Sequence, residues 1–412
     1  MCGIAGCYHT DKEVNRELFE KMVDMIEYRG PDDRGTFYDQ NLALGHRRLS
    51  IIDLSDAGHQ PFYYRDRYVL VYNGEIYNYR ELRGELEDAG YSFDTETDTE
   101  VLIAAYDKYG SACVERFNGM WAFAVYDRLE HCLFLSRDRF GVKPLYYYHK
   151  DGTLIFASEE KQIIKMADHR FRVNRPRLME YLIRGVHDYS EETMFMDIFQ
   201  LRGGCNMFYD LRNDKKEIQR YYDIADIPQS DESFEEAAAG FRKAFEESVR
   251  LRLRADVPVG YCLSGGLDSS AIVCMADRII KDDNLDVKQE SVSSCFEDKR
   301  YDEQEYIDEV LKFTAVEGHK IFPQGNDVLK DLDDVLWHMD EPFTSTSMYA
   351  QWNVFKGAAE QGLTVMLDGQ GADEQLAGYT GYYSVIFAEY LRKFKFGKFF
   401  RELKAYKKLR AS

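Results

Sequence analysis

The chain opens with Met1-Cys2-Gly3-Ile4-Ala5-Gly6, and the interpretation of its first half depends on this stretch. Cysteine at the second position is small enough for the initiator methionine to be removed, which would give Cys2 both a thiol and a free α-amino group. An α-amine with an ordinary pKa of about 8 can serve as the base for the adjacent thiol, as in an N-terminal nucleophile. Taken alone, the stretch favours a buried first strand instead, because free cysteine packs as a small hydrophobic residue.

The composition is that of a globular protein with a strong acidic balance. The 412 residues suffice for two or three domains, and 45% of them are apolar. The formal charge of −20 repels nucleic acid and anionic membranes, so we expect neither as a partner. No apolar run is long enough to span a membrane, and the first residues lack a signal-peptide core. The eight cysteines are scattered, which predicts reduced thiols, no zinc site and a cytoplasmic protein.

The first two hundred residues alternate short β-rich runs with helices. The spacing of apolar residues predicts helices at 17–26, 79–89 and 98–109. Short runs rich in β-branched and aromatic residues predict strands at 42–52, 68–72, 120–126, 131–136, 145–148 and 154–157. Because these elements follow no strict βαβ rhythm, we expect antiparallel sheets flanked by helices, an α+β sandwich.

Two features of this region could act on the same substrate as Cys2. Arg48 lies in a strand-like run, where its guanidinium could clamp a carboxylate with two hydrogen bonds, although a surface arginine is the commoner outcome. Asn73-Gly74 follows an apolar strand and is first of all a turn signal. The same pair also offers a side-chain amide and a bare backbone N–H, which are the donors that an oxyanion hole requires.

A third feature is the start of the helix at 98–109. Thr97 and Glu100 are spaced as a capping box, which places Asp98 in the first helical turn. An acid there is favoured by the helix dipole, and it could alternatively bind a substrate α-ammonium group. A fourth stretch, Arg137–Pro144, is more typical of a structural turn network than of chemistry.

Five motifs in order resemble the glutaminase domain of the class II glutamine amidotransferases; they are Met-Cys-Gly-Ile-Ala-Gly at the start, Arg-Gly-Pro-Asp-Asp at 29–33, His-Arg-Arg-Leu-Ser-Ile at 46–51, Tyr-Asn-Gly-Glu-Ile-Tyr-Asn at 72–78 and Thr-Asp-Thr-Glu at 97–100. The resemblance implies an N-terminal nucleophile fold, which is an αββα sandwich. It also implies that Cys2 is the nucleophile, with Asn73 and Gly74 as the oxyanion hole. Arg48, Glu75 and Asp98 would then bind the α-carboxylate and α-amino group of glutamine.

The second half has a different rhythm. Ser233 and Glu236 form a second capping box, which opens an amphipathic helix. After it, predicted strands alternate with predicted helices, which favours a parallel sheet with helices on both faces and ligands beyond the carboxyl ends of the strands. The strands are expected at 257–263, 290–296, 319–322 and 363–367, and the helices at 269–280, 302–313, 326–339 and 347–361.

Two glycine-bearing loops follow strands of this predicted sheet. Leu263-Ser264-Gly265-Gly266-Leu267-Asp268-Ser269-Ser270 offers backbone N–H groups and hydroxyls at a helix N-terminus, where they can hold a phosphate chain. The loop is not a Walker loop, because no lysine follows the glycines; it resembles the pyrophosphate loop of enzymes that split ATP into AMP and pyrophosphate. The ATP site that this resemblance implies comprises Leu263, Ser264, Gly265, Gly266, Asp268, Ser269, Ser270, Ser294, Asp368 and Gly369. Asp268 and Asp373 are the candidate Mg²⁺ ligands.

Both halves together resemble the glutamine-hydrolysing asparagine synthetases. The resemblance implies a class II glutaminase domain at 1–210, a linker at 211–232 and an α/β nucleotide-binding synthetase domain at 233–412. Family members continue beyond this length, so we expect the second domain to be incomplete at its C-terminus. The implied substrates are glutamine, aspartate and ATP with Mg²⁺, and the implied product is asparagine, formed from ammonia and an aspartyl-adenylate. A homodimer is a further expectation.

Some features leave other functions open. The second loop carries Gln370 where the family often has glutamate, and His338–Pro342 and Thr344–Ser347 are expected to line the acceptor pocket. A related amidotransferase could act on a different carboxylate, a glutaminase alone could remain if the second half is inert, and a non-catalytic scaffold would use the folds only for binding. The residues 390–410 form a basic run expected to be a surface helix.

Overall fold

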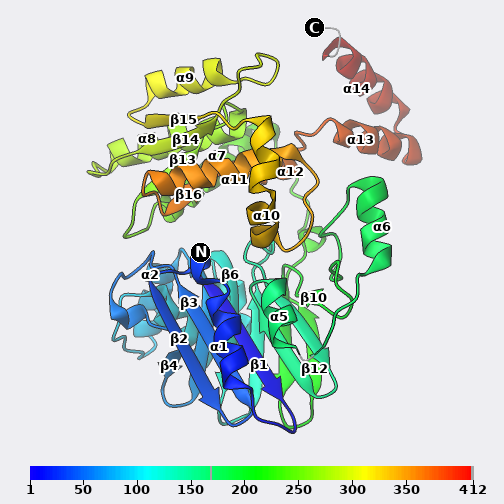
Figure 1. Ribbon diagram of the computed structural model, residues 1–412. Coiled ribbons are helices and arrows are strands. Elements are labelled where there is room, and N and C mark those ends of the chain that lie inside the picture. The colour runs from blue at the N-terminus through cyan, green and yellow to red at the C-terminus, as the bar shows by residue number, and fades with distance from the viewer. Residues whose placement is uncertain (168, 410–412) are drawn as a thin grey trace. The chain divides into compact units, whose positions relative to one another are not determined.

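A computed structural model describes residues 1–167 and 169–409 (Figure 1). The chain divides into two compact units. The first unit consists of Met1–Val259 together with Ile321–Val365, and the second begins at Gly260–Lys320 and resumes at Met366.

The first unit contains two six-stranded sheets whose paired strands are antiparallel (Figure 1). In spatial order the first sheet comprises β10 (Phe199–Gln200), β8 (Tyr146–Lys150), β9 (Thr153–Ala157), β1 (Gly3–His9), β3 (Leu42–Arg48) and β2 (Asp33–Asp39). The second comprises β12 (Lys215–Arg220), β11 (Cys205–Asp210), β7 (Cys132–Arg137), β6 (Gly119–Asp127), β5 (Tyr68–Ile76) and β4 (Phe62–Tyr64).

Alternation of side chains along each strand produces four layers. On β1, Ile4 and Tyr8 belong to the core between the two sheets, whereas Ala5 and Cys7 pack with residues of α1 (Arg16–Asp24) and α5 (Glu160–Met166). On β5, Val69 and Val71 enter the same central core. The intervening residues of β5 pack with α2 (Tyr79–Glu87), α3 (Asp98–Tyr109) and α4 (Cys113–Arg116). The predicted αββα sandwich is therefore confirmed.

Local structure differs from the sequence prediction at several places, since the strands β2, β4, β10, β11 and β12 are not among the predicted ones and one predicted cap is changed. Residues 210–220, which suggest a charged loop, include β12, which pairs with β11 in register from Cys205↔Arg220 to Asp210↔Lys215. One half of the capping box predicted at Thr97 is present, because the Thr97 hydroxyl accepts a hydrogen bond from the Thr99 N–H at 3.1 Å. The other half is wrong, because Glu100 accepts from the Asp94 and Thr95 N–H groups instead of from Thr97. Three donors of the preceding turn, including the Thr95 hydroxyl, hold the Glu100 carboxylate away from the cap.

The second unit contains a four-stranded sheet in the order β15 (Glu317–Ile321), β14 (Glu290–Ser294), β13 (Val259–Cys262) and β16 (Val365–Leu367). β13 and β14 are parallel, as the alternation of strands and helices predicts. Its helices are α8 (Leu267–Asp282), α9 (Gln304–Phe313), α12 (Ala372–Leu376), α13 (Gly381–Arg392) and α14 (Phe396–Leu409). The described part of the predicted basic helix, residues 390–409, is thus divided between α13 and α14.

The remaining helices belong to the first unit. They are α6 (Arg175–Arg184), α7 (Phe234–Arg252), α10 (Val328–Met339) and α11 (Thr346–Glu360). The capping box predicted at Ser233 and Glu236 is present at the start of α7. Within the described ranges, no helix combines the length and the apolar character needed to cross a bilayer.

Gly6 of β1 offers a test of the central packing. A Cβ at this position would lie 2.1 Å from two ring carbons of the buried Phe156. We expect Gly6→Ala to lower the free energy of unfolding by about 1–3 kcal/mol, because the core must shift to admit the methyl group. Gly84→Ala is the control, since nothing lies within 4 Å of a Cβ on this α2 glycine, and we expect it to stabilise by up to about 1 kcal/mol. Chemical denaturation of both variants measures the difference; equal midpoints would contradict the described packing.

Candidate functional site

Cys2 lies immediately before β1, at the edge where β3 ends. Its thiol is 3.4 Å from the Leu49 backbone N–H, which donates to it, and 3.5 Å from the Leu49 carbonyl. The Cys2 carbonyl accepts a hydrogen bond from Arg29 Nε at 3.0 Å. Burial raises the pKa of the Cys2 thiol. The α-amine of Met1, the Leu49 backbone, Lys143 and Arg48 oppose that rise. The Cys2 thiol therefore needs a nearby base or cation to ionise near neutral pH.

The predicted oxyanion pair lies on β5. Asn73 is fully buried, and neither its amide nitrogen nor its amide oxygen has a hydrogen-bond partner among the described residues. An orphaned buried amide is costly and is typical of a group that waits for a ligand. Gly74 is required by close approach, because a Cβ there would lie 2.2 Å from the Met120 carbonyl on β6.

Two buried carboxylates flank this strand end. Asp98, at the start of α3, accepts hydrogen bonds from the Tyr72 hydroxyl at 3.0 Å and the Ile76 N–H at 2.9 Å. Burial nevertheless raises the pKa of Asp98 to about 6. Burial also raises the pKa of Glu75 to about 7, against the attraction of Lys143. Both groups can hold a cation near neutral pH, as the predicted binding of an α-ammonium group requires.

Arg48 directly precedes Leu49, whose backbone contacts the Cys2 thiol. Its guanidinium donates to the backbone carbonyls of Ser55, at 2.7 Å, and Asp53, and it packs against Gly58. The described contacts of Arg48 thus hold the loop 53–58 beside the site. Binding of a substrate carboxylate by Arg48 stays a prediction.

Lys143 is the site residue that sequence reasoning missed. It is 4% exposed, burial lowers its pKa, and its charge acts on both Glu75 and Cys2. The rest of its stretch is structural, as predicted, because the Asp138 carboxylate accepts backbone N–H groups from this turn. The available signal was a lone lysine between Val142 and Pro144, before an aromatic strand.

The second candidate site is the loop between β13 and α8. The Ser264 and Ser269 hydroxyls are 3.0 Å apart, and Ser264 accepts from the Gly266 N–H at 3.3 Å. Gly265 has φ +84°, a conformation that favours glycine, and Gly266 is the N-cap of α8. The α8 N-terminus therefore faces the loop with the positive end of its dipole, as a phosphate site requires. Leu263, Asp268 and Ser270 lie in the same strand–loop–helix segment.

The neighbouring strands bring other predicted residues to this loop. A Cβ on Gly369 would lie 2.9 Å from Ser269 N and 3.2 Å from Asp268 Cβ, so the loops after β13 and β16 touch. The Ser294 hydroxyl at the end of β14 is buried and lacks a hydrogen-bond partner among the residues described. Asp368 lies beside the Cys262 thiol, whose pKa is raised by burial and by that carboxylate.

The predicted magnesium ligands are arranged unevenly. Asp268 lies at the contact of the two loops, whereas an Asp373 carboxylate oxygen lies against Gly378. In the part of the chain that the structure describes, no group of three or more His, Cys, Asp or Glu side chains could hold a metal ion by itself. Asp268 fits a Mg²⁺ that takes its other ligands from phosphates and water; a role for Asp373 stays a prediction.

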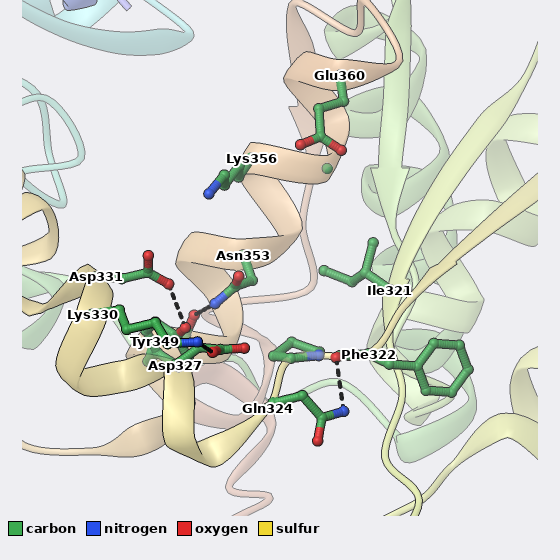
Figure 2. Close-up of a pocket in the computed structure, with 12 residues that line it drawn as sticks. Ile321, Phe322, Gln324, Asp327, Lys330, Asp331, Tyr349, Asn353, Lys356 and Glu360 are labelled. Carbon is green, nitrogen blue, oxygen red and sulfur yellow. Dashed lines mark hydrogen bonds and ion pairs between the residues drawn. The ribbon is translucent and has the colours of Figure 1, made fainter.

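A polar cavity of about 380 Å³ lies elsewhere, in the segment 321–365 (Figure 2). The Tyr349 hydroxyl donates to Asp331 at 2.6 Å on its wall, and Asn353 donates to the Tyr349 carbonyl at 2.9 Å. The cavity contains none of the residues predicted for either site. Its lining is Ile321, Phe322, Pro323, Gln324, Asp327, Lys330, Asp331, Tyr349, Asn353, Lys356, Gly357 and Glu360.

Comparison with known families assigns the two halves of the chain to two domain families. A family model described as a glutamine amidotransferase domain matches residues 1–222, and one described as asparagine synthase matches residues 240–412. The sandwich with Cys2 at its edge and the parallel sheet with its glycine loops thus define an amidotransferase domain joined to a synthase domain.

The relatives narrow this class. A Methanocaldococcus jannaschii protein provisionally named glutamine-hydrolysing asparagine synthetase 2 is 37% identical over 95% of this chain and 78% of its own length. Glutamine-hydrolysing asparagine synthetase 1 of Bacillus subtilis is 34% identical over 93% of this chain, but the match spans only 59% of that protein. Amidase chyE of Penicillium rubens is 30% identical over 94% of this chain and 61% of its own length. The chain belongs to the glutamine-hydrolysing asparagine synthetase family.

The raised pKa of Glu75 predicts a stability cost that depends on pH. Its folded pKa of about 7 exceeds the ordinary value of 4.5, so ionised Glu75 disfavours the folded state. The cost is absent below about pH 4.5 and complete above about pH 7, where it reaches about 3 kcal/mol. We expect Glu75→Gln to gain stability relative to wild type as the pH rises through this window. Urea denaturation across pH measures the gain, with exposed Glu13→Gln as the control; a pH-independent difference would contradict the assignment.

Proposed function

We propose that the protein uses glutamine as a nitrogen donor to convert aspartate into asparagine at the expense of ATP. The observation that carries the proposal is the orphaned Asn73 amide beside the buried carboxylates of Glu75 and Asp98, together with a buried lysine, Lys143, whose charge acts on both Glu75 and Cys2. Family membership supports the second half-reaction.

In the first half-reaction, the Cys2 thiolate attacks the side-chain amide carbon of glutamine. The Asn73 amide and the Gly74 N–H stabilise the oxyanion. The C–N bond then breaks, ammonia departs, and a γ-glutamyl thioester remains on Cys2. Water hydrolyses this thioester to glutamate. Glu75 and Asp98 hold the α-ammonium group, and Arg48 holds the α-carboxylate. Once Met1 is removed, the α-amine of Cys2 is the base for the thiol.

In the second half-reaction, the aspartate β-carboxylate attacks the α-phosphorus of ATP and pyrophosphate leaves. Ammonia then attacks the acyl-adenylate, which releases AMP and asparagine. The loop from Leu263 to Ser270, with Ser294, Asp368 and Gly369, holds the nucleotide through backbone N–H groups, hydroxyls and the α8 dipole. Mg²⁺, held by Asp268, would neutralise phosphate charge.

A second candidate function is amidation of a different carboxylate. It is favoured by Gln370, which replaces a glutamate that is common in the family's second loop, and by the similarity to a fungal protein named an amidase. AMP release with alternative carboxylates, but not with aspartate, would favour this function.

The proposal extends to the cellular location, the domain division and the oligomeric state of the protein. The eight cysteines are free, which fits a cytoplasmic enzyme. The domain division into 1–210, 211–232 and 233–412 stays a prediction. Family matches at 1–222 and 240–412 support two domains, and β12 extends the first domain into the predicted linker. A homodimer stays a prediction, which sedimentation of the purified protein would test.

The direct test follows glutamate, AMP and asparagine in purified protein supplied with glutamine, aspartate and MgATP. We expect Cys2→Ala to abolish glutamine hydrolysis, because no other thiol can form the thioester. Synthesis from added ammonia should survive, since the second half-reaction does not use the thiol. Unchanged hydrolysis in Cys2→Ala, or a mass showing that Met1 is retained in active protein, would refute the nucleophile assignment.

The Asn73 amide predicts a second kinetic effect. We expect Asn73→Ala to lower kcat for glutamine hydrolysis by about 10²–10³-fold, because one oxyanion donor is lost, with little change in KM. Asn213→Ala, in the exposed turn between β11 and β12, is the matched control. A loss confined to KM would instead assign Asn73 to substrate binding.

A further inference from the structure

Charged side chains connect the Cys2 backbone with the end of α10. Arg29 Nε donates to the Cys2 carbonyl at 3.0 Å, and Arg29 Nη1 is 2.8 Å from Glu159 Oε1. Lys161 Nζ contacts Glu159 Oε2 and also lies 2.8 Å from Asp340 Oδ1. None of the four side chains is more than 9% exposed, so these contacts are weakly screened by water. We name Arg29, Glu159, Lys161 and Asp340 the charge relay.

Within the charge relay, the orientation of Arg29 depends on few contacts. Its Nη2 has no hydrogen-bond partner among the described residues, so Glu159 and the Cys2 carbonyl are the polar groups that fix its guanidinium. Burial opposes ionisation of Glu159, but Arg29 and Lys161 hold its pKa below the ordinary value. Glu159 is therefore a carboxylate shared by two cations.

Asp340 shares Lys161 with Glu159 from the other side. Its Oδ2 accepts a hydrogen bond from the Glu160 N–H at 2.7 Å, and its backbone has φ +62° just after α10. The adjacent Glu341 accepts from the Met194 N–H at 2.5 Å, and the Phe343 carbonyl accepts from the Tyr181 hydroxyl at 2.7 Å. The segment 340–343 is thus fixed on the first unit at several points, although residues 338–342 were expected to line the acceptor pocket.

We propose that Asp340, a residue of the asparagine synthase match, is a positioning residue for the Cys2 nucleophile. With Asp340 present, Lys161 divides its charge between two carboxylates, and Glu159 retains its bond to Arg29. Without the Asp340 charge, Lys161 keeps Glu159 and the Tyr28 hydroxyl, at 3.0 Å, as its polar partners, so Lys161 is drawn more strongly to Glu159. The Glu159–Arg29 bond then weakens, and Arg29 holds the Cys2 carbonyl less firmly. The thiol is then placed less firmly beside the Leu49 backbone. The inference rests on the proposed role of Cys2 in glutamine hydrolysis.

The test is the kinetics of glutamine hydrolysis by Asp340→Asn. Asparagine keeps the shape and tolerates the positive φ, so the change removes mainly the charge. We expect kcat to fall about tenfold, because the nucleophile is misplaced. KM should stay within about twofold, since Arg48, Glu75 and Asp98 are outside the charge relay. Asp327→Asn, which removes the exposed ion pair with Lys330 on the same segment, is the matched control and should leave kcat unchanged.

Substitutions of Lys161 distinguish a positioning role from a merely structural one, because loss of a structural ion pair would not change kcat. We expect Lys161→Arg to retain most of kcat and Lys161→Met to lose it, while Glu159→Gln with Asp340→Asn should be no worse than the more impaired single variant. If Asp340→Asn lowers the melting temperature but leaves kcat and KM unchanged, Asp340 is not a positioning residue.

Failure of the relay and failure of the proposed function give different results. If Cys2→Ala still hydrolyses glutamine, the nucleophile assignment fails. If Cys2→Ala is inactive and Asp340→Asn has wild-type kcat, only the relay is refuted.

Discussion

The antiparallel pairing of β1 is the constraint on which the first site depends. β3 and β9 pair with β1 on its two edges, with Gly3 opposite Arg47 and Ala5 opposite Ala157. These two backbone ladders fix β1, which begins at Gly3, so Cys2 is held at the end of an interior strand of the sheet. The chain that leaves β3 returns the Leu49 backbone to the thiol, and β5 of the other sheet carries Asn73 and Gly74, the predicted oxyanion donors.

The site carries groups that oppose folding. Glu75 and Asp98 are buried carboxylates with raised pKa values, and the Asn73 amide is orphaned. Groups that are costly in the folded state are typical of a site that a ligand completes. A site of this kind gives up stability in exchange for a polar arrangement that needs little reorganisation during reaction.

The sequence predicts those parts of the structure that leave a local pattern. Helix 98–109 has the predicted bounds, because its cap and its terminal glycine are both adjacent in sequence. β12 was missed because its side chains are largely exposed and charged, so its strand pairing leaves no apolar alternation. The contact between Glu160 and Asp340 joins residues 180 positions apart, so no local sequence pattern predicts it. Lys143 was missed for the same reason, since only the fold shows where its side chain ends.

The division of the chain into units has a consequence for the order of folding. The chain completes β15 in the second unit, contributes α10 and α11 to the first unit, and returns as β16 at the edge of the parallel sheet. That edge strand follows β15 by more than forty residues that pack in the other unit. During synthesis, the four-stranded sheet therefore cannot be completed before α10 and α11 have emerged, so its assembly depends on pairing between strands far apart in the chain.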